Sequence, residues 1–386
     1  MTSLTDTTAS PDGAAQPLDE PPLTVAVPLG DRSYEVLIGH GLMGVAGALI
    51  ARVAKPRRAL IVTDTAVGPR YLARLMRVME GSGFACHHMA VAEGEGSKSP
   101  QTLFQVVDAI LDAQLERDDV VVALGGGVVG DLAGFAAAVS RRGMPFVQVP
   151  TTLLAQVDSA VGGKTGINTR HGKNLVGAFH QPSLVLCDLD ALTTLPDRHI
   201  RAGYAEIIKI ALIGDVPFFA RLSALGAEAP RKDIARSIAT AVAAKARIVA
   251  EDEREADRRA LLNLGHTFAH AIEQCAGYDG RIVHGEAVGL GLCLAFRFSV
   301  ALGLCAQDDA ERVTRHLEAV GLPTTFQALP VTLTIKGLVS AMEQDKKVSN
   351  AIIRFVLVRG IGEAFVSNGV DPEALHAFLE GEGLAP

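Results

Sequence analysis

The feature that most limits how this chain can fold is the regular alternation of short β-branched runs with helical stretches over its first half. Apolar side chains at helical spacing predict helices over residues 69–81 and 99–114. Strands that alternate with helices in this way form a parallel sheet covered on both faces. Buried strands are expected at five runs, residues 59–63 (ALIVT), 86–91, 119–124 (DVVVAL), 146–149 and 184–187.

The pattern changes after Pro196, where strand-like runs become scarce until residues 352–358. Ala- and Leu-rich stretches predict long helices over residues 200–213, 231–251, 261–275 and 286–302. We therefore expect a Rossmann-like α/β nucleotide-binding domain over residues 23–195, followed by a mostly α-helical domain over residues 196–386.

Composition narrows the class of protein. Residues 1–22 lack the basic start and apolar core of a signal peptide, so we expect a disordered tail and a cytoplasmic protein. Residues 120–139 carry a single charge, Asp131, but their glycines favour a strand, a turn and a buried helix over a membrane span. The net charge of −7 argues against nucleic acid or an anionic membrane as a partner. The five scattered cysteines lack CxxC spacing and are typical of reduced thiols.

A glycine-rich turn, GGGVVGD at residues 125–131, follows the expected strand at 119–124. Its GxGxxG spacing favours close approach of a nucleotide pyrophosphate, although a turn that needs glycine for steric reasons alone explains an isolated match equally well. The carboxylate that usually follows about 20 residues later is missing, because Pro150-Thr151-Thr152 stands there. Asp64, at the end of an earlier strand, is the better candidate for a ribose contact.

Two lysines lie near further glycines. The segment SAVGGKT at residues 159–165 lacks the first glycine of a Walker A loop, because Asp158 occupies that position. Lys164 and the pair Lys173-Asn174 are nevertheless suited to contact an anionic ligand.

The densest group of polar residues lies in the helical half. Glu206 and Lys209 have i, i+3 spacing, which suits either a shared functional face or a surface salt bridge. Four further polar residues follow at spacings of four, three and four, which predicts one stripe along a single helix. This stripe contains Arg259, Asn263, His266 and His270.

The histidines indicate a metal site. His266 and His270 form an HxxxH pair that one helix can present to zinc, although Thr267 replaces the glutamate of HExxH proteins. His284 supplies a third histidine near the start of the next helix. A buried histidine satisfied by its neighbours is the usual explanation for any one of them, but three histidines and a carboxylate on apolar helices favour a metal.

These residues and the blocks around them resemble the 3-dehydroquinate synthase family of sugar phosphate cyclases. The resemblance spreads over most of the chain beyond the tail. Its blocks are GEGSKS (94–99), GGGVVGDLAGFAA (125–137), RGMPFVQVPTTLLAQVDSAVGGKTGIN (142–168), GKNLVGAFHQP (172–182), AEIIK (205–209), LLNLGHTFAHAIE (261–273), HGEAV (284–288) and DKK (345–347).

The resemblance implies a two-domain homodimeric lyase that holds NAD and one zinc ion, with cobalt as an alternative metal. The implied metal ligands are Glu206, His266 and His284, which leaves His270 to face substrate. The implied NAD-binding residues are Asp64, Glu93, Gly94, Glu95, Gly96, Ser97, Lys98, Gly127, Val128, Val129, Gly130, Asp131, Thr151, Thr152, Lys164, Lys173, Ala191, Leu192, Thr193 and Thr194. The implied substrate and catalytic residues are Asp158, Lys164, Asn174, Lys209, Lys245, Glu255, Arg259, Asn263, His270 and Lys346, with Arg142 reaching across from the partner subunit.

The implied reaction converts 3-deoxy-D-arabino-heptulosonate 7-phosphate to 3-dehydroquinate and phosphate in the shikimate pathway. Transient oxidation by NAD, phosphate elimination, re-reduction, ring opening and aldol closure would follow one another, with zinc as a Lewis acid. Three alternatives remain: another sugar phosphate cyclase, a metal-dependent polyol dehydrogenase, and a non-catalytic binding protein.

Overall fold

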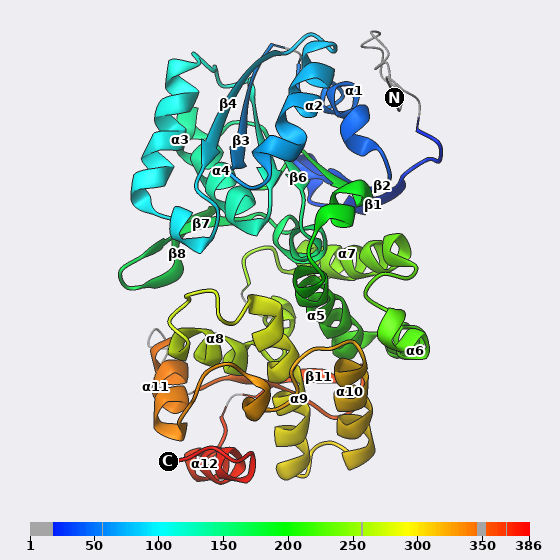
Figure 1. Cartoon of the computed structure of the whole chain (residues 1–386), viewed down its shortest axis with the longest axis vertical. Helices are drawn as coiled ribbons and strands as arrows, with labels where there is room; N and C mark the ends of the chain where they lie inside the picture. Colours follow the sequence, from blue (N-terminus) through cyan, green and yellow to red (C-terminus); the bar gives the residue numbers. More distant parts are fainter. Residues whose placement is uncertain (1–17, 56, 256–257, 346–352, 368) are drawn as a thin grey trace, which may run out of the picture.

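The computed structural model describes residues 18–386 except 56, 256–257, 346–352 and 368. Its upper half in Figure 1 is an α/β layered unit and its lower half is mostly helical. The expected disordered tail, residues 1–22, lies outside the described residues up to residue 17. No helix in the described ranges is both long and apolar enough to cross a membrane.

Seven of the described strands form one sheet in the order β1-β2-β9-β6-β5-β3-β4. Adjacent strands from β2 to β4 run parallel, whereas β1 pairs antiparallel with β2. The strands are β1 Leu23–Val27, β2 Tyr34–Gly39, β3 Arg58–Asp64, β4 Ala85–Val91, β5 Val120–Gly125, β6 Phe146–Pro150 and β9 Leu184–Asp188. All five runs expected from the sequence are strands of this sheet, which confirms the α/β prediction.

Alternating side chains of the central strands enter two separate cores, as expected for strands covered on both faces. In β3, Ile61 packs with α1 and α2 on one face, while Leu60 and Val62 pack with α3 and α4 on the other. The second face is not covered by α3 and α4 along its whole width. At β2 and β9, Val36 and Val185 pack into the core of the helical half instead. The helices are α1 Ala46–Ile50, α2 Gly68–Glu80, α3 Pro100–Asp112 and α4 Gly127–Val139.

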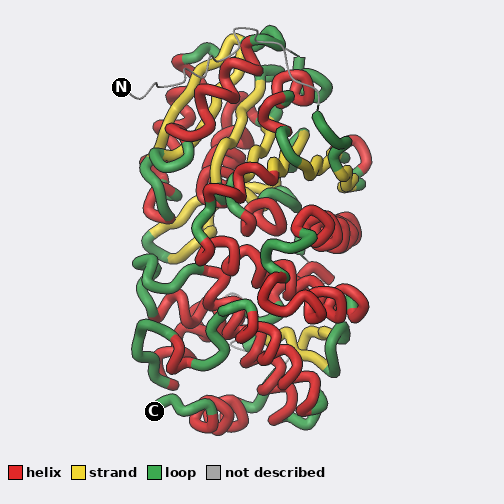
Figure 2. The backbone as a smooth tube through the Cα atoms, turned by 45° about the vertical axis from the view of Figure 1, so that its right-hand side comes forward, coloured by secondary structure: helices red, strands yellow, loops and turns green. Residues whose placement is uncertain are grey.

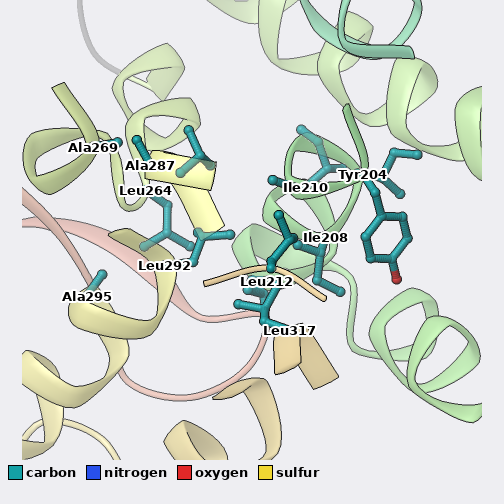
Figure 3. Close-up of a cluster of buried hydrophobic side chains, with 14 of the residues drawn as sticks. Tyr204, Ile208, Ile210, Leu212, Leu264, Ala269, Ala287, Leu292, Ala295 and Leu317 are labelled. Carbon is teal, nitrogen blue, oxygen red and sulfur yellow. The ribbon is translucent and has the colours of Figure 1, made fainter. Parts of the chain in front are cut away.

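The helical half surrounds α5, in which every residue from Ala202 to Ile213 is buried. Figure 3 shows part of its core, where Ile208 and Leu212 of α5 lie near Leu292 of α9 and Leu317 of α10. The helices of this half are α5 Asp197–Gly214, α6 Val216–Leu225, α7 Ile234–Glu251, α8 His266–Cys275, α9 His284–Ala301, α10 Gln307–Ala319, α11 Ile335–Asp345 and α12 Pro372–Gly381.

Two small antiparallel hairpins complete the fold. The hairpin β7 (Lys164–Thr169) and β8 (Gly172–Phe179) projects beside the junction of the two halves (Figure 1). The pair β10 (Phe355–Val358) and β11 (Ala364–Ser367) lies among the helices of the lower half, as the strand colour in Figure 2 shows. The strand expected over residues 352–358 is β10, and its residue 352 lies outside the described part.

The helix expected over residues 261–275 is wrong in its first part. Residues Arg258–Asn263 form a 3-10 turn, and α8 begins only at His266. Between them Gly265 has φ of +78°, a left-handed conformation that ends one helical segment and starts another. The interruption lies in the middle of the predicted polar stripe.

Candidate active site at the junction of the two halves

A cavity of about 1030 Å³ opens between the carboxyl edge of the parallel sheet and the helical half. Open α/β sheets bind ligands outside the carboxyl ends of their strands, and this cavity lies there. Its walls include Asp64 at the end of β3, Gly127 after β5 and Thr151 after β6. Lys245 of α7 and His284 of α9 line it from the helical half.

The glycine-rich turn serves both close packing and the cavity. A Cβ on Gly125 would lie 2.6 Å from the side chain of Val129, and one on Gly130 would lie 2.6 Å from Gln148 Oε1, so these two positions need glycine for steric reasons. Gly127, the first residue of α4, lines the cavity. The positive end of the α4 dipole and its unpaired N–H groups therefore favour an anion there.

A buried lysine links this turn to the hairpin. Lys98 Nζ donates to Asp131 Oδ2 at 2.6 Å and to Asn174 Oδ1 at 2.5 Å. Burial raises the pKa of Asp131 in spite of the opposing charge of Lys98. Asp64 anchors the next turn, because its Oδ1 accepts from the backbone N–H groups of Ala66 and Val67, both at 2.8 Å. These contacts fix the backbone around the α/β side of the cavity.

Asp158 is the shared partner of two lysines on the helical side, Lys209 and Lys245. It lies in a π-helical turn, Ala155–Ser159, a rare form that is frequent at functional sites. Lys245 Nζ donates to both its backbone oxygen and its Oδ1, each at 2.6 Å, and Lys209 Nζ is 4.0 Å from the same Oδ1. Burial alone would raise the pKa of Asp158, but the charges of Lys245 and Lys209 outweigh burial and lower it.

Two further cations are held at the cavity wall. Arg259 donates to the backbone oxygens of Gly162 at 3.0 Å and Glu253 at 2.5 Å, which fixes its guanidinium. Lys164 pairs with Glu255, whose other oxygen accepts from Asn263 at 3.1 Å. Burial would raise the pKa of Glu255, but Lys164 outweighs burial and lowers it. Glu255 thus holds the partly exposed Lys164 in position.

Among the described residues, one group of three side chains could hold a metal ion. It contains Glu206, His266 and His284, whose ligand atoms all lie within 4.8 Å of one another. They come from α5, α8 and α9. Glu206 Oε1 is 3.5 Å from His266 Nε2 and 3.4 Å from His284 Nε2, and Lys209 pairs with the other carboxylate oxygen. Both oxygens of Glu206 are buried, and neither makes a well-formed hydrogen bond to the described part of the chain.

These donors fit a divalent metal. Two imidazoles and one carboxylate, with a cavity beside them, match catalytic zinc sites, which keep a position open for substrate. Burial would lower the pKa of His284, but Glu273 and Glu206 outweigh burial and raise it. Burial and the charge of Lys209 lower the pKa of His266 to about 3, so this imidazole is neutral, which is the form that binds a metal.

Close backbone contacts bring the three ligand-bearing helices together. A Cβ on Gly285, the second residue of α9, would lie 2.0 Å from the backbone oxygen of Ala202 in α5. A Cβ on Gly291 of α9 would lie 2.2 Å from the backbone oxygen of Gly265, the residue before α8. Only glycine permits these approaches, so the sequence HGEAV places His284 beside Glu206 through its glycine.

The residues predicted from the sequence fall into three groups. The cavity is lined by Asp64, Glu93, Gly94, Glu95, Lys98, Gly127, Val128, Asp131, Thr151, Thr152, Asp158, Lys164, Lys173, Asn174, Thr194, Lys245, Glu255, Arg259 and His284. The described residues outside its lining are Gly96, Ser97, Val129, Gly130, Arg142, Ala191, Leu192, Thr193, Glu206, Lys209, Asn263, His266 and His270. Lys346 lies outside the described residues.

Two interpretations made from helical spacing are wrong. Arg259 and Asn263 do not share a helix with His266 and His270, because Gly265 interrupts the chain. Glu206 and Lys209 do not form a surface salt bridge, because they are 1% and 2% exposed. His270 is not part of the metal-type cluster, which contains His284 together with Glu206 and His266.

Sequence reasoning missed Glu273, a buried carboxylate of α8 whose Oε2 is 3.1 Å from His284 Nδ1. It follows His266 by seven residues, which places both on one helix face, so helical spacing from the correct α8 start would have found it.

Comparison with known proteins gives a consistent family. Family models described as "3-dehydroquinate synthase N-terminal" and "3-dehydroquinate synthase C-terminal" match residues 88–202 and 203–348. The chain is 53% identical over 365 residues to a 3-dehydroquinate synthase of Caulobacter vibrioides (strain NA1000 / CB15N), a match that covers 93% of this chain and 99% of that protein.

Solved structures agree with the fold. A 2-epi-5-epi-valiolone synthase from Streptomyces hygroscopicus subsp. jinggangensis 5008, with NAD+ and Zn2+ bound, has a TM-score of 0.82 and 32% identity over 91% of this chain and 96% of that chain. A 2-deoxy-scyllo-inosose synthase, with carbaglucose-6-phosphate, NAD+ and Co2+, has a TM-score of 0.83 at 24% identity over 93% of this chain and 100% of that chain, and it supports the fold alone. This chain belongs to the 3-dehydroquinate synthase family.

Proposed function

We propose that this chain converts 3-deoxy-D-arabino-heptulosonate 7-phosphate to 3-dehydroquinate and phosphate in the shikimate pathway, as a carbon–oxygen lyase. The observation that carries the proposal is the meeting of three features at one cavity. A glycine turn suited to a nucleotide and several lysines with Arg259 line this cavity, and the donor set of Glu206, His266 and His284 reaches it through His284. The division into a nucleotide domain, residues 23–195, and a metal and substrate domain, residues 196–386, is part of this proposal.

The α/β side would hold NAD. Gly127 and Val128, at the start of α4, would face the pyrophosphate, and Asp64 would accept from ribose hydroxyls. Glu206, His266 and His284 would hold zinc or cobalt. When bound, NAD supplies a hydride acceptor and donor, and the metal supplies a Lewis acid for a carbinol oxygen.

The chain's own cations would bind the two anionic ends of the substrate. Arg259, already fixed by two backbone oxygens, would offer its remaining donors to one oxyanion. Lys164 would exchange Glu255 for a substrate oxygen, because that pair is only partly buried. Lys209 and Lys245, which both approach Asp158, would stabilise negative charge that develops on a substrate oxygen. Asn263 and His270 would orient the departing phosphate.

The proposal includes a homodimer in which Arg142 reaches the neighbouring active site. Arg142 is exposed and does not line the cavity of its own chain. It lies in a left-handed corner, with φ of +63° and Arg141 at +50°, which turns this segment away from the end of α4. An arginine held in this way is suited to contact another subunit.

The two enzymatic alternatives predict different products. The related valiolone synthase is 32% identical, so a different phosphorylated sugar is the nearest alternative substrate. The buried Lys209, Lys245 and Arg259 favour a substrate with a carboxylate as well as a phosphate, and this favours the heptulosonate. A polyol dehydrogenase would share the nucleotide turn but would accumulate NADH.

The deciding experiment supplies the heptulosonate phosphate and measures phosphate release, with the product identified by NMR. We expect 3-dehydroquinate, no net NADH, and loss of turnover after exhaustive chelation that added zinc or cobalt restores. Net NADH would identify a dehydrogenase, and activity only on a sugar phosphate that lacks a carboxylate would identify another cyclase. Full turnover without metal would overturn the role of the three ligands.

A further inference from the structure

Glu273 lies between the two functional sides of the cavity. It is 6% exposed, on the α8 face that also carries His266, and each of its carboxylate oxygens has a different partner. Oε2 lies 3.1 Å from His284 Nδ1, and Oε1 lies 3.4 Å from Lys173 Nζ. No role was expected for this residue from the sequence.

We infer that Glu273 is a positioning residue that orients His284 toward the metal site and holds Lys173 of the β7–β8 hairpin, thereby coupling metal binding to nucleotide binding. The inference deepens the proposed function and rests on it. It concerns a residue that touches neither the proposed metal nor the proposed nucleotide.

The contact with His284 selects which of its two ring nitrogens carries the proton. The two ring nitrogens point in different directions, and Nε2 is 3.4 Å from Glu206 Oε1 while Nδ1 faces Glu273. An Nδ1–H that donates to Glu273 leaves the Nε2 lone pair for a metal and makes it more basic. His266 has a weaker counterpart, because its Nδ1 is 3.2 Å from the backbone oxygen of Leu264. Glu273 therefore places a full charge behind one ligand only.

The contact with Lys173 reaches the other half of the molecule. Lys173 Nζ also lies 3.8 Å from Glu95 Oε1 and 4.4 Å from the ring centroid of Tyr278. Glu95 belongs to the turn after β4 and accepts from Asn168 of β7 at 2.7 Å. Both Glu95 and Lys173 line the cavity, so a continuous set of polar contacts joins its nucleotide side to the metal ligand.

A purely structural role would use the same contacts, since an acid between two bases could simply pin α8 to the hairpin. The two roles differ in what removal of the carboxylate changes. A structural pin affects the free energy of unfolding, whereas a positioning residue also changes the metal affinity and the ligand field.

The test compares Glu273→Ala and the nearly isosteric Glu273→Gln with the wild type. Each protein is stripped of metal, and its zinc affinity is measured by competition with a chromophoric chelator. We expect the Kd for zinc to rise about 10- to 100-fold in the alanine variant and less in the glutamine variant, which keeps an acceptor. The visible absorption of the cobalt-loaded protein should shift in both, because the basicity of His284 changes.

Coupling is measured as the ratio of NAD affinities with and without metal. We expect metal to tighten NAD binding in the wild type, and this ratio to move toward one in Glu273→Ala. The matched control is Glu382→Ala, which breaks the partly buried pair with Arg297 in the same half without touching the cavity. It should lower the melting temperature and leave the zinc affinity unchanged.

The inference is overturned if Glu273→Ala lowers only the melting temperature. Should that variant fail to fold, an unchanged Kd and cobalt spectrum in Glu273→Gln would overturn it equally. These measurements use no substrate. A wild type that binds no metal would defeat the proposed function, whereas normal metal binding in both variants would defeat this inference alone.

Discussion

The two sides of the cavity are built in different ways. On the α/β side, turns that follow parallel strands supply backbone groups and glycines, as at Gly127 after β5. On the helical side, the consecutive helices α8 and α9 and the more distant α5 supply the side chains of His266, His284 and Glu206. Each turn on the α/β side is local in sequence, so it can be predicted from the strand that precedes it. The helical side exists only after long-range packing has placed α5, α8 and α9 side by side.

The two sides also bury charge differently. Lys98 on the α/β side has one carboxylate partner, Asp131, whose pKa is raised by burial. Lys209 on the helical side has two carboxylates within 4.0 Å, Glu206 and Asp158, and their pKa values are lowered because neighbouring lysines outweigh burial. The helical side therefore depends on a balanced set of buried charges, whereas the α/β side has a simpler pair.

Loss of one proposed metal ligand should affect the helical side of the cavity and leave the α/β side intact. We expect His266→Ala to lose bound metal and all measurable turnover, because two remaining donors hold a catalytic metal poorly. The protein should stay folded and bind NAD, since that side is formed by other elements. Metal content, circular dichroism and NAD titration check the three parts. Stoichiometric metal in this variant would show that the ligand set is wrong.

Removal of the buried lysines compares the charge balance of each side. Lys209→Met in the metal-free protein leaves Glu206 buried without its cation, which should cost about 3 to 5 kcal/mol of the free energy of unfolding. Lys98→Met should cost less, because Asp131 can take up a proton more easily. Denaturant titration measures both. The control is Lys232→Met, which removes the exposed ion pair with Glu228. It should lower the free energy of unfolding by about 1 kcal/mol or less. Equal losses for Lys98 and Lys209 would contradict the comparison.

The smallest effect concerns pH. Burial lowers the pKa of His316 to about 4, and its Nε2 lies 2.7 Å from the hydroxyl of Tyr204 on α5. The unfolded chain binds a proton more readily, so this contribution to stability is present above the unfolded pKa and is lost as pH falls from about 6.5 through about 4.

Between pH 7.5 and pH 5 the loss should reach about 2 kcal/mol, and His316→Gln should remove that part of the pH dependence. Denaturant titrations at the two pH values measure it, with the exposed His376→Gln as control. A His316 variant that keeps the full wild-type slope would show that another group carries the effect.

The sequence predicted the sheet well because its strands are buried on both faces and therefore form continuous apolar runs, such as residues 59–63. It failed at residues 259–270 because spacing alone cannot detect a left-handed residue, and Gly265 adopts one. Periodicity alone favoured His266 with His270 as the metal pair. The backbone approach that selects His284 instead depends on α5, which lies about 80 residues earlier in the chain.

The glycine contacts of α9 matter for any redesign of the proposed metal site. Gly285 sets the approach of α9 to α5, and Gly291 sets its approach to the start of α8, so the main chain fixes the spans among all three ligands. The main-chain packing of the helices would then set the preference among ions of different radius. A search for variants that accept a larger ion would have to begin at these glycines.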